Sequence, residues 1–448
     1  MEKRTFLKTT TALAGGALLS GVVSCDPSVK EEHLKNWAGN FEFSTNNVHY
    51  PKTLEEVQAI VKKCDKLSAL GSQHSFNKIA DNTENLISLK EMNKVISIDR
   101  AANTVTVEAG MRYGELAPYL HQNGYALHNL ASLPHITIAG SVATATHGSG
   151  VNNGNLSTGI VAIEFVNAAG EVINLSKADA AFMGAVVGLG ALGVVTKVTL
   201  SIEPTFNMKQ YVYRNMPMQQ LEKNFDAIEK SGYSVSLFTD WKNKNINEVW
   251  IKSKVENTDT PAPPELFGAK LATQNMHPLE GESAENCTEQ MGVSGPWFER
   301  MPHFKMGFKP SAGKELQSEY FVAIEHAYEA ILAIEKLHEK ITPHLFITEI
   351  RTIAADEFWM SPCYKKNCVA IHFTWKQEVD TVMNLLPLIE AQLAPFNPRP
   401  HWGKLFTMSP EILHSRIEKL AEFKQLVNQY DPKGKFRNAF LERNVYSG

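Results

Sequence analysis

The chain has 448 residues, of which 43% are hydrophobic and 21% charged, and its net charge is −4. This length favours two domains, and the composition is that of a soluble globular protein. Both signs of charge are interspersed, so the sequence has no basic footprint for a nucleic-acid partner. The five cysteines show no CxxC pair and no metal-like spacing with histidine, so we expect no metal site. Cys363 and Cys368 could form a disulfide in an oxidising compartment, but the sequence does not establish one.

The N-terminus has the pattern of an export signal. Lys3 and Arg4 precede a weakly apolar run that ends in small residues and is short for a membrane span. Residues 3–8 resemble a twin-arginine signal with lysine in place of the first arginine, and an ordinary secretory signal is the alternative. Residues 22–25 resemble a lipoprotein box, which would place a lipid anchor on Cys25, and a plain cleaved signal is the alternative. We expect residues 1–25 to direct export of the protein in a bacterium. The exported protein would be periplasmic or a membrane-anchored lipoprotein.

Helices and strands alternate in the first part of the remaining chain. Thr53 and Glu56 form a capping box ahead of apolar residues at helical spacing. A second helix is predicted over residues 112–123, with Gly124 as its stop and Pro118 as a kink. Period-two and β-branched segments predict strands at residues 86–89, 95–98, 104–107, 172–175 and 194–200. We expect one α+β domain over residues 33–203.

The glycines Gly188, Gly190 and Gly193 match GxGxxG by letter. A dinucleotide-binding fingerprint should open a helix, whereas residues 194–200 are typical of a strand. We therefore interpret these glycines as close backbone packing.

A second layer begins after Pro204. Strands are predicted near residues 211–213, 235–239 and 248–252, with a helix over 218–230. The proline-rich stretch from residue 258 and the segment up to residue 313 are predicted to be loops or a lid. From residue 320 the alternation of strand and helix resumes, which predicts an α/β domain over residues 204–420.

Two stretches of small residues are the first candidates for a ligand site. In residues 70–81 a turn presents His74, and a histidine there can act as nucleophile, base or metal ligand. The alternative is a hydrogen-bonded loop histidine. Residues 129–150 are dense in Gly, Ala, Ser and Thr, which suits a backbone lying against a large anionic ligand.

Two predicted strands carry polar side chains on otherwise apolar faces. Period-two alternation places Glu349 and Arg351 on one face, and His372 and Thr374 likewise. If the strands are neighbours, all four side chains line one pocket. The alternatives are a structural salt bridge and a core histidine. Lys404 follows a proline-rich segment and is either a site residue or a surface charge.

Together, residues 71–81, 132–150, 401–404 and 431–438 and the two polar pairs resemble the FAD-dependent oxidases of the vanillyl-alcohol oxidase superfamily, most closely the alditol oxidase and aldonolactone oxidase branch. The resemblance runs from about Trp37 to the C-terminus. It implies an α+β, two-domain flavin oxidase: a PCMH-type FAD-binding domain plus an α/β substrate domain. It also implies that residues 421–448 return to the FAD domain.

The resemblance implies roles for individual residues. FAD would be attached covalently through His74, although Gln73 departs from the glycine found there in many relatives. The implied cofactor-binding residues are Gly71, Ser72, Gln73, His74, Ser75, Phe76, Ser132, His135, Gly140, Ser141, Thr144, His147 and Gly148. The implied catalytic residues are Ser132, Glu349, Arg351, His372, Thr374 and Lys404.

The expected reaction is oxidation of an alditol such as xylitol or sorbitol at a terminal CH–OH. Flavin would take the hydride and pass electrons to O2, giving H2O2. Arg351 and Lys404 would stabilise alkoxide charge, while Glu349 and Ser132 would fix neighbouring hydroxyls. One alternative is an aldonolactone oxidase or dehydrogenase. Another is an enzyme with a different electron acceptor, for which the surroundings of Ala131 would matter. A third is a non-catalytic carbohydrate-binding lipoprotein.

Overall fold

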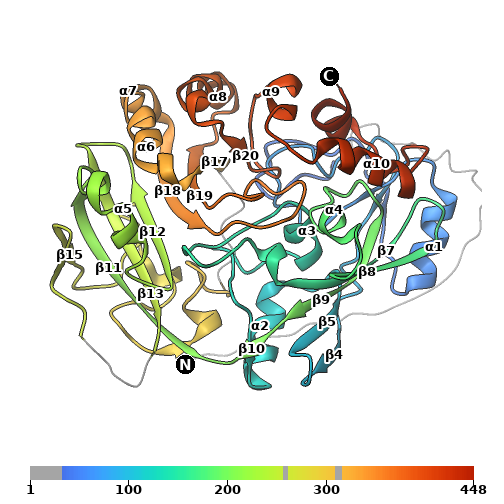
Figure 1. Ribbon diagram of the computed structural model, residues 1–448, viewed down its shortest axis with the longest axis horizontal. Helices are drawn as coiled ribbons and strands as arrows, with labels where there is room; N and C mark the ends of the chain where they lie inside the picture. Colours follow the sequence, from blue (N-terminus) through green and yellow to red (C-terminus); the bar gives the residue numbers. More distant parts are fainter. Residues whose placement is uncertain (1–32, 256–260, 308–314, 448) are drawn as a thin grey trace, which may run out of the picture. The chain divides into compact units, whose positions relative to one another are not determined.

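The computed structural model describes residues 33–255, 261–307 and 315–447 (Figure 1). The predicted export signal and Cys25 lie outside these residues. Within them, no helix combines the length and apolar character needed to cross a membrane.

The first half of the described chain builds three small sheets, one of which is only the pair β6 (Tyr125–Ala126) and β10 (Glu203–Pro204). The five-stranded sheet is antiparallel in the order β4-β5-β9-β7-β8, and its strands are Val95–Asp99, Thr104–Glu108, Val194–Ser201, Ile160–Val166 and Val172–Ser176. Residues in β9 alternate strictly between buried and half-buried, as period-two patterning predicts. A three-stranded parallel sheet joins β1 (Val48–His49), β3 (Leu86–Ile87) and β2 (Ser68–Ala69). Strand β2 leads directly into the His74 turn.

The predicted helices of this part form where expected. Helix α1 (Leu54–Lys63) begins at Thr53, whose side chain accepts a hydrogen bond from the Glu56 N–H. Helix α2 (Tyr113–Gln122) continues through Pro118. The glycine-rich segment before β9 forms turns rather than a helix, so the prediction against a dinucleotide fingerprint is confirmed.

The second half is organised around one large antiparallel sheet. Its order is β14-β15-β11-β13-β12-β18-β19-β17-β20, with β16 on the edge of β11. The bounds are Asn207–Pro217 (β11), Ser234–Thr239 (β12), Asn245–Lys254 (β13), Glu265–Leu266 (β14), Ala269–Leu271 (β15), Gly295–Pro296 (β16), Glu315–Ala323 (β17), Leu345–Ile353 (β18), Cys368–Lys376 (β19) and Arg399–Pro400 (β20). Helices α5 (Gln220–Glu229), α6 (Ala327–Glu335) and α8 (Val379–Leu393) pack against one another beside this sheet (Figure 1). The segment predicted to be loops or a lid thus adds three short strands, β14, β15 and β16, to the sheet edge.

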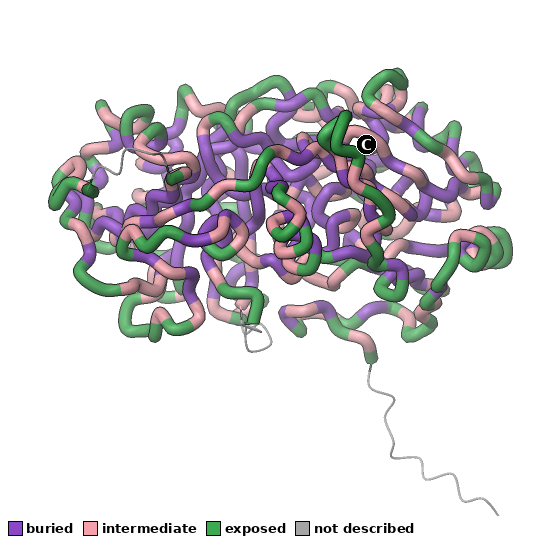
Figure 2. Tube along the Cα trace, turned by 90° about the horizontal axis from the view of Figure 1, so that it is seen from below, coloured by how far each residue is buried: buried purple, intermediate pink, exposed green. Residues whose placement is uncertain are grey.

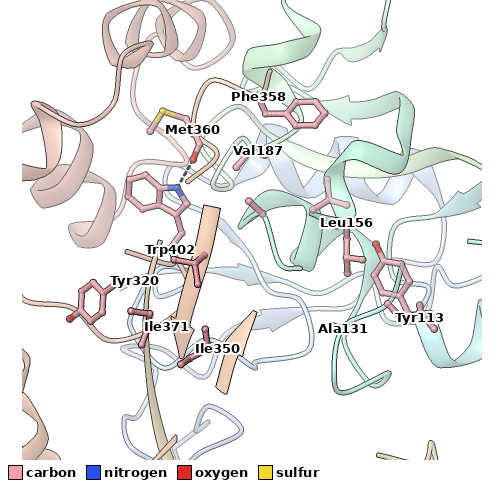
Figure 3. Packing of buried hydrophobic residues seen from close by; sticks show 14 of the residues in the cluster. Tyr113, Ala131, Leu156, Val187, Tyr320, Ile350, Phe358, Met360, Ile371 and Trp402 are labelled. Atoms are coloured by element: carbon pink, nitrogen blue, oxygen red, sulfur yellow. Dashed lines mark hydrogen bonds between the residues drawn. The ribbon is translucent and has the colours of Figure 1, made fainter. Parts of the chain in front are cut away.

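One hydrophobic core runs between the two halves. It joins Tyr113 and Leu156 with Tyr320, Ile350 and Ile371 (Figure 3), and buried residues gather in the interior of the molecule (Figure 2). Residues Leu34–Gly448 accordingly cluster as one compact unit. The domain boundaries at residues 203 and 420 stay predictions.

The remaining predicted features concern the tail and the cysteines. Helix α10 (Leu420–Tyr430) is followed by a turn, and Asn438 Nδ2 then donates hydrogen bonds to Ile79 O and Asp81 O. The C-terminal segment therefore returns to the loop that carries His74. Cys363 and Cys368 are buried, free thiols in the structure, without a disulfide.

Candidate active site

A cavity of about 1000 Å³ brings the predicted stretches together. Its walls come from the His74 loop, the small-residue stretch, the glycines that precede β9 and one face of strands β17, β18 and β19. Ser132, Glu349, Arg351, His372, Thr374 and Lys404 all line it. Separate parts of the sequence therefore share one site.

The His74 loop is fastened to the segment that carries Lys404. The Phe76 N–H donates to Gly403 O at 2.7 Å, and Asn77 Nδ2 donates to Trp402 O and Lys404 O at 2.8 and 2.7 Å. These bonds hold the loop and the lysine at a fixed separation.

The His74 ring is held in a defined state. It stacks on Trp37 with 5.1 Å between ring centroids, and its Nδ1 lies 2.9 Å from Ser72 O. Burial lowers the pKa of His74 to about 4, so the ring is neutral at pH 7. With Nδ1–H donated to the backbone, Nε2 carries the lone pair.

Gln73 has a backbone conformation that usually belongs to glycine. Its φ is 64°, in the left-handed region. Gln73 stands where the family that the sequence resembles often has glycine, and the observed φ gives that glycine a physical reason.

Strand pairing brings the polar pairs into register. Glu349 lies opposite His372 where β18 pairs with β19, and Glu319 on β17 lies opposite His372 from the other side. The two strands are thus neighbours in one sheet, which was the condition for the four side chains to line one pocket.

Glu319 is the hub of this cluster. Its carboxylate is fully buried: Oε1 lies 2.9 Å from Arg351 Nη2, and Oε2 lies 2.7 Å from Lys404 Nζ. His147 Nε2 is 3.3 Å from Oε1, without the alignment of a hydrogen bond. Burial alone would raise the pKa of Glu319, but Lys404, His147 and Arg351 outweigh it and hold the pKa well below its usual range. Glu319 is therefore an anion that balances two cations.

The neighbouring groups fix the protons around the lysine. Burial and Lys404 hold the pKa of His372 well below its usual range, so its ring is neutral. Its Nδ1 accepts from Lys404 Nζ at 2.6 Å, which leaves Nε2–H to donate to Thr374 Oγ1 at 3.0 Å. Burial lowers the pKa of Lys404 although Glu319 opposes the shift. The Thr374 hydroxyl hydrogen is thus free to point to a ligand.

Comparisons with known proteins agree with this architecture. The family described as FAD binding domain matches residues 46–176, and that of D-arabinono-1,4-lactone oxidase matches residues 310–444. Alditol oxidase from Streptomyces sp. is 44% identical over 93% of this chain and 99% of its own length. The chain belongs to the FAD-dependent alditol oxidase family. L-gulono-1,4-lactone dehydrogenase from Mycobacterium tuberculosis is 26% identical over 91% of this chain and 98% of its own.

The chain has a mixed α+β, two-domain flavoenzyme fold like that of cholesterol oxidase. The crystal structure of cholesterol oxidase from B. sterolicum superposes with a TM-score of 0.75 over 92% of this chain and 96% of its own, at 13% identity. The predicted two-domain flavin oxidase fold is confirmed at this level.

The cavity fits the FAD that the family implies. A Cβ atom added at Gly71 or Gly140 would lie 2.8 Å from Thr137 Oγ1, so only glycines let the His74 loop approach helix α3 (Ile138–Ala143). Thr137 Oγ1 is buried, lines the cavity and has no hydrogen-bond partner among the described residues. A hydroxyl in this position is available to a ligand's oxygen atoms. Gly188, Gly190 and Gly193 also line the wall.

Most of the predicted cofactor residues line this cavity: Gly71, Ser72, Gln73, His74, Ser75, Phe76, Ser132, Gly140, Ser141, Thr144 and His147. His135 and Gly148 do not. His135 Nε2 instead lies 2.7 Å from Met306 O, and a Cβ atom at Gly148 would lie 2.4 Å from Leu130 O. Their places in the small-residue stretch suggested ligand contact, but one side chain turns to a neighbouring loop and the glycine serves backbone packing.

Besides Glu319, two residues of the site were not predicted from the sequence: His303, which lines the cavity, and Lys252 behind it. His303 Nε2 lies 2.7 Å from Glu349 Oε1, and Lys252 contacts His303 from behind. Glu319 shares a period-two face with Glu315 and Gln317, which was a readable signal. His303 comes from a segment without periodicity, so no sequence pattern marked it.

Proposed function

We propose that this protein oxidises an alditol at a terminal CH–OH, using FAD and passing electrons to O2 to give H2O2. The observation that carries the proposal is that Arg351 and Lys404 both pair with the buried Glu319, in the same cavity as the His74 loop. The 44% identity to alditol oxidase over 93% of the chain supports the substrate class.

Bound FAD supplies the hydride acceptor. The residues proposed to hold it are His74 with its loop, and Thr137, Gly140, Ser141 and Thr144 from the facing segment. We further propose covalent attachment at His74. A neutral ring has a nitrogen lone pair for bond formation, and stacking on Trp37 keeps that ring in place.

The substrate hydroxyls are matched by the polar cluster. Arg351 and Lys404 stabilise the negative charge that develops on the reacting oxygen, in a site already organised by Glu319. Glu349 accepts from one neighbouring hydroxyl, and Ser132 and Thr374 each bind another. A substrate that lacks these hydroxyls leaves buried polar groups unpaired, which is the basis of selectivity for polyols.

A lactone is the second candidate substrate, because the D-arabinono-1,4-lactone oxidase family matches residues 310–444, which include β17 to β19. An electron acceptor other than O2 is a related alternative, because one relative is named a dehydrogenase. Ala131, whose surroundings would matter for the choice of acceptor, lines the cavity. Rates measured with xylitol, sorbitol and sugar lactones, with H2O2 recorded beside dye reduction, separate these cases.

The test of the flavin proposal is a denaturing gel viewed for flavin fluorescence. We expect a fluorescent band from the wild type and none from His74→Ala. His135→Ala is the matched control, because this histidine lies in the same region but does not line the cavity. A colourless native wild-type protein would overturn the function. A yellow native protein without a fluorescent band would overturn only the covalent link.

We also propose export and a lipid anchor at Cys25, supported by the pattern of residues 1–25. Cell fractionation of the wild type and Cys25→Ala tests this. The variant should leave the membrane fraction. Wild-type protein that stays in the cytoplasm would contradict it.

A further inference from the structure

A buried lysine and a histidine stand behind Glu349. Lys252 on β13 is only 1% exposed, and its Nζ lies 2.5 Å from Met301 O, 3.0 Å from Pro302 O and 3.1 Å from His303 Nδ1. His303 Nε2 then lies 2.7 Å from Glu349 Oε1. The three side chains form a continuous line from the core to the cavity.

Counting hydrogens assigns the direction of each bond. An ammonium group has three N–H donors, and Lys252 uses all three on these partners. Nδ1 of His303 is therefore an acceptor, so the hydrogen of the neutral ring sits on Nε2 and is donated to Glu349 Oε1. The lysine thus selects the tautomer of the histidine.

The histidine in turn leaves one carboxylate oxygen for a ligand. The contacts of Glu349 with His303 and with Arg351 Nε, at 2.7 and 3.5 Å, are both made by Oε1. Oε2 makes no ion pair or hydrogen bond within the part of the chain that the structure describes. Since Glu349 lines the cavity, Oε2 is the oxygen available to accept from a substrate hydroxyl.

The ring itself cannot turn freely. Phe238 and Trp250 pack edge-on against His303, with centroid separations of 5.5 and 5.2 Å. Burying a charged lysine this deeply is costly unless the charge is hydrogen-bonded, and all three donors of Lys252 have partners here.

We infer that Lys252 and His303 are positioning residues for substrate recognition: they hold Glu349 as a fixed hydroxyl acceptor and thereby set the affinity for a polyol. The inference rests on the proposed function, since it needs Glu349 to bind a substrate hydroxyl. Neither residue takes part in hydride transfer, so their loss acts on substrate binding more than on turnover.

The geometry also predicts a pH dependence. The charged and titratable groups around Lys252 are Glu349, Cys287, Arg351 and His303, and burial lowers the pKa of Lys252 to about 7 against the pull of Glu349. Once deprotonated, Lys252 accepts from Nδ1–H, and His303 then turns a lone pair toward Glu349. The hydrogen bond from His303 to Glu349 is therefore lost as the pH rises through neutrality, so KM for the alditol rises.

The experiment measures kcat and KM from pH 5.5 to 9 for the FAD-loaded wild type, Lys252→Met and Lys254→Met. Lys254 lies two residues further along the same strand and pairs with Glu203 away from the cavity, so it is the matched control. We expect Lys252→Met to raise KM about tenfold with kcat changed less than threefold, and to lose the neutral step in KM. Flavin content should be unchanged.

Two variants of the histidine complete the test. His303→Gln keeps an N–H donor for Glu349, whereas His303→Leu removes it, so the glutamine variant should bind the alditol more tightly by about tenfold. Equal KM values in the two variants would overturn the inference, as would a wild-type KM in Lys252→Met. If Lys252→Met fails to fold, the comparison of His303→Gln with His303→Leu still tests the inference. A wild type that binds FAD but turns over no polyol or lactone would instead count against the proposed function.

Discussion

At the scale of single residues, Glu319 supplies the negative charge that balances the two cations of the site. Arg351 is buried and the Lys404 side chain is only 13% exposed, and cations in such places are tolerated only when paired. Glu319 lines the cavity and contacts both cations, which are proposed to stabilise charge on a substrate oxygen. One carboxylate therefore combines a structural role with the organisation of positive charge.

Replacing Glu319 with glutamine should weaken both roles. The two cations lose their shared anion, so we expect the free energy of unfolding to fall by about 3 kcal/mol. Glu319 raises the pKa of Lys404, so its loss lowers that pKa further and the activity at high pH declines first. Melting temperature and a pH profile of kcat/KM measure the two effects. Glu315→Gln, on the same strand face, is the control, and an unchanged melting temperature in Glu319→Gln would contradict the argument.

The sequence predicted the residues that line the cavity better than those that support them. Glu349, Arg351, His372 and Thr374 were found because period-two alternation reveals polar side chains on an apolar strand face. His303 reaches the site through tertiary packing of an irregular segment, which leaves no local signature. His135 shows the opposite error, since a small-residue stretch does not tell which side chain turns inward.

Among the elements, the C-terminal segment closes the cofactor end of the cavity. Asp431 accepts from the N–H groups of Lys435 and Phe436 and so shapes the turn after α10. Phe436 and Asn438 then line the cavity, and Asn438 holds two carbonyls of the His74 loop. A segment distant in sequence thus fixes the shape of the loop that is proposed to carry FAD.

Asn438→Ala should weaken the contact between the C-terminal segment and the His74 loop. It leaves Ile79 O and Asp81 O without their donor, and we expect a loss of about 2 kcal/mol in unfolding free energy. We also expect a smaller fraction of protein carrying flavin, measured by the ratio of flavin to protein absorbance. Asn428→Ala, an exposed position on α10, is the control. Full flavin content in Asn438→Ala would show that the tail does not shape the site.

In the whole molecule, the large sheet is anchored to the small-residue stretch by backbone bonds. The Gly150 N–H donates to Thr352 O, and the Ala354 N–H donates to Asn153 O, both at 2.9 Å. These bonds set β18, with Glu349 and Arg351, against the wall proposed to hold the cofactor. The sequence predicted the individual strands and helices, but such pairings depend on three-dimensional closure and could not be read from local patterns.

The same junction buries a carboxyl group that should govern stability against pH. Glu229 on α5 is fully buried, and its Oε2 accepts from Thr352 Oγ1 at 3.0 Å. Burial raises the pKa of Glu229 to about 8. Between pH 4.5 and 8 the unfolded chain has released this proton while the folded protein keeps it, so stability falls as the pH rises through this range.

Glu229→Gln should remove that slope, because glutamine has the shape of the protonated acid and does not titrate. At pH 5 we expect the variant and the wild type to unfold alike. At pH 8 the variant should be more stable by on the order of 3 kcal/mol, following the size of the pKa shift. Urea unfolding at both pH values measures the difference, and Glu222→Gln, exposed on the same helix, is the control. Wild-type and Glu229→Gln stabilities that fall in parallel with pH would show that Glu229 is already ionised in the folded protein.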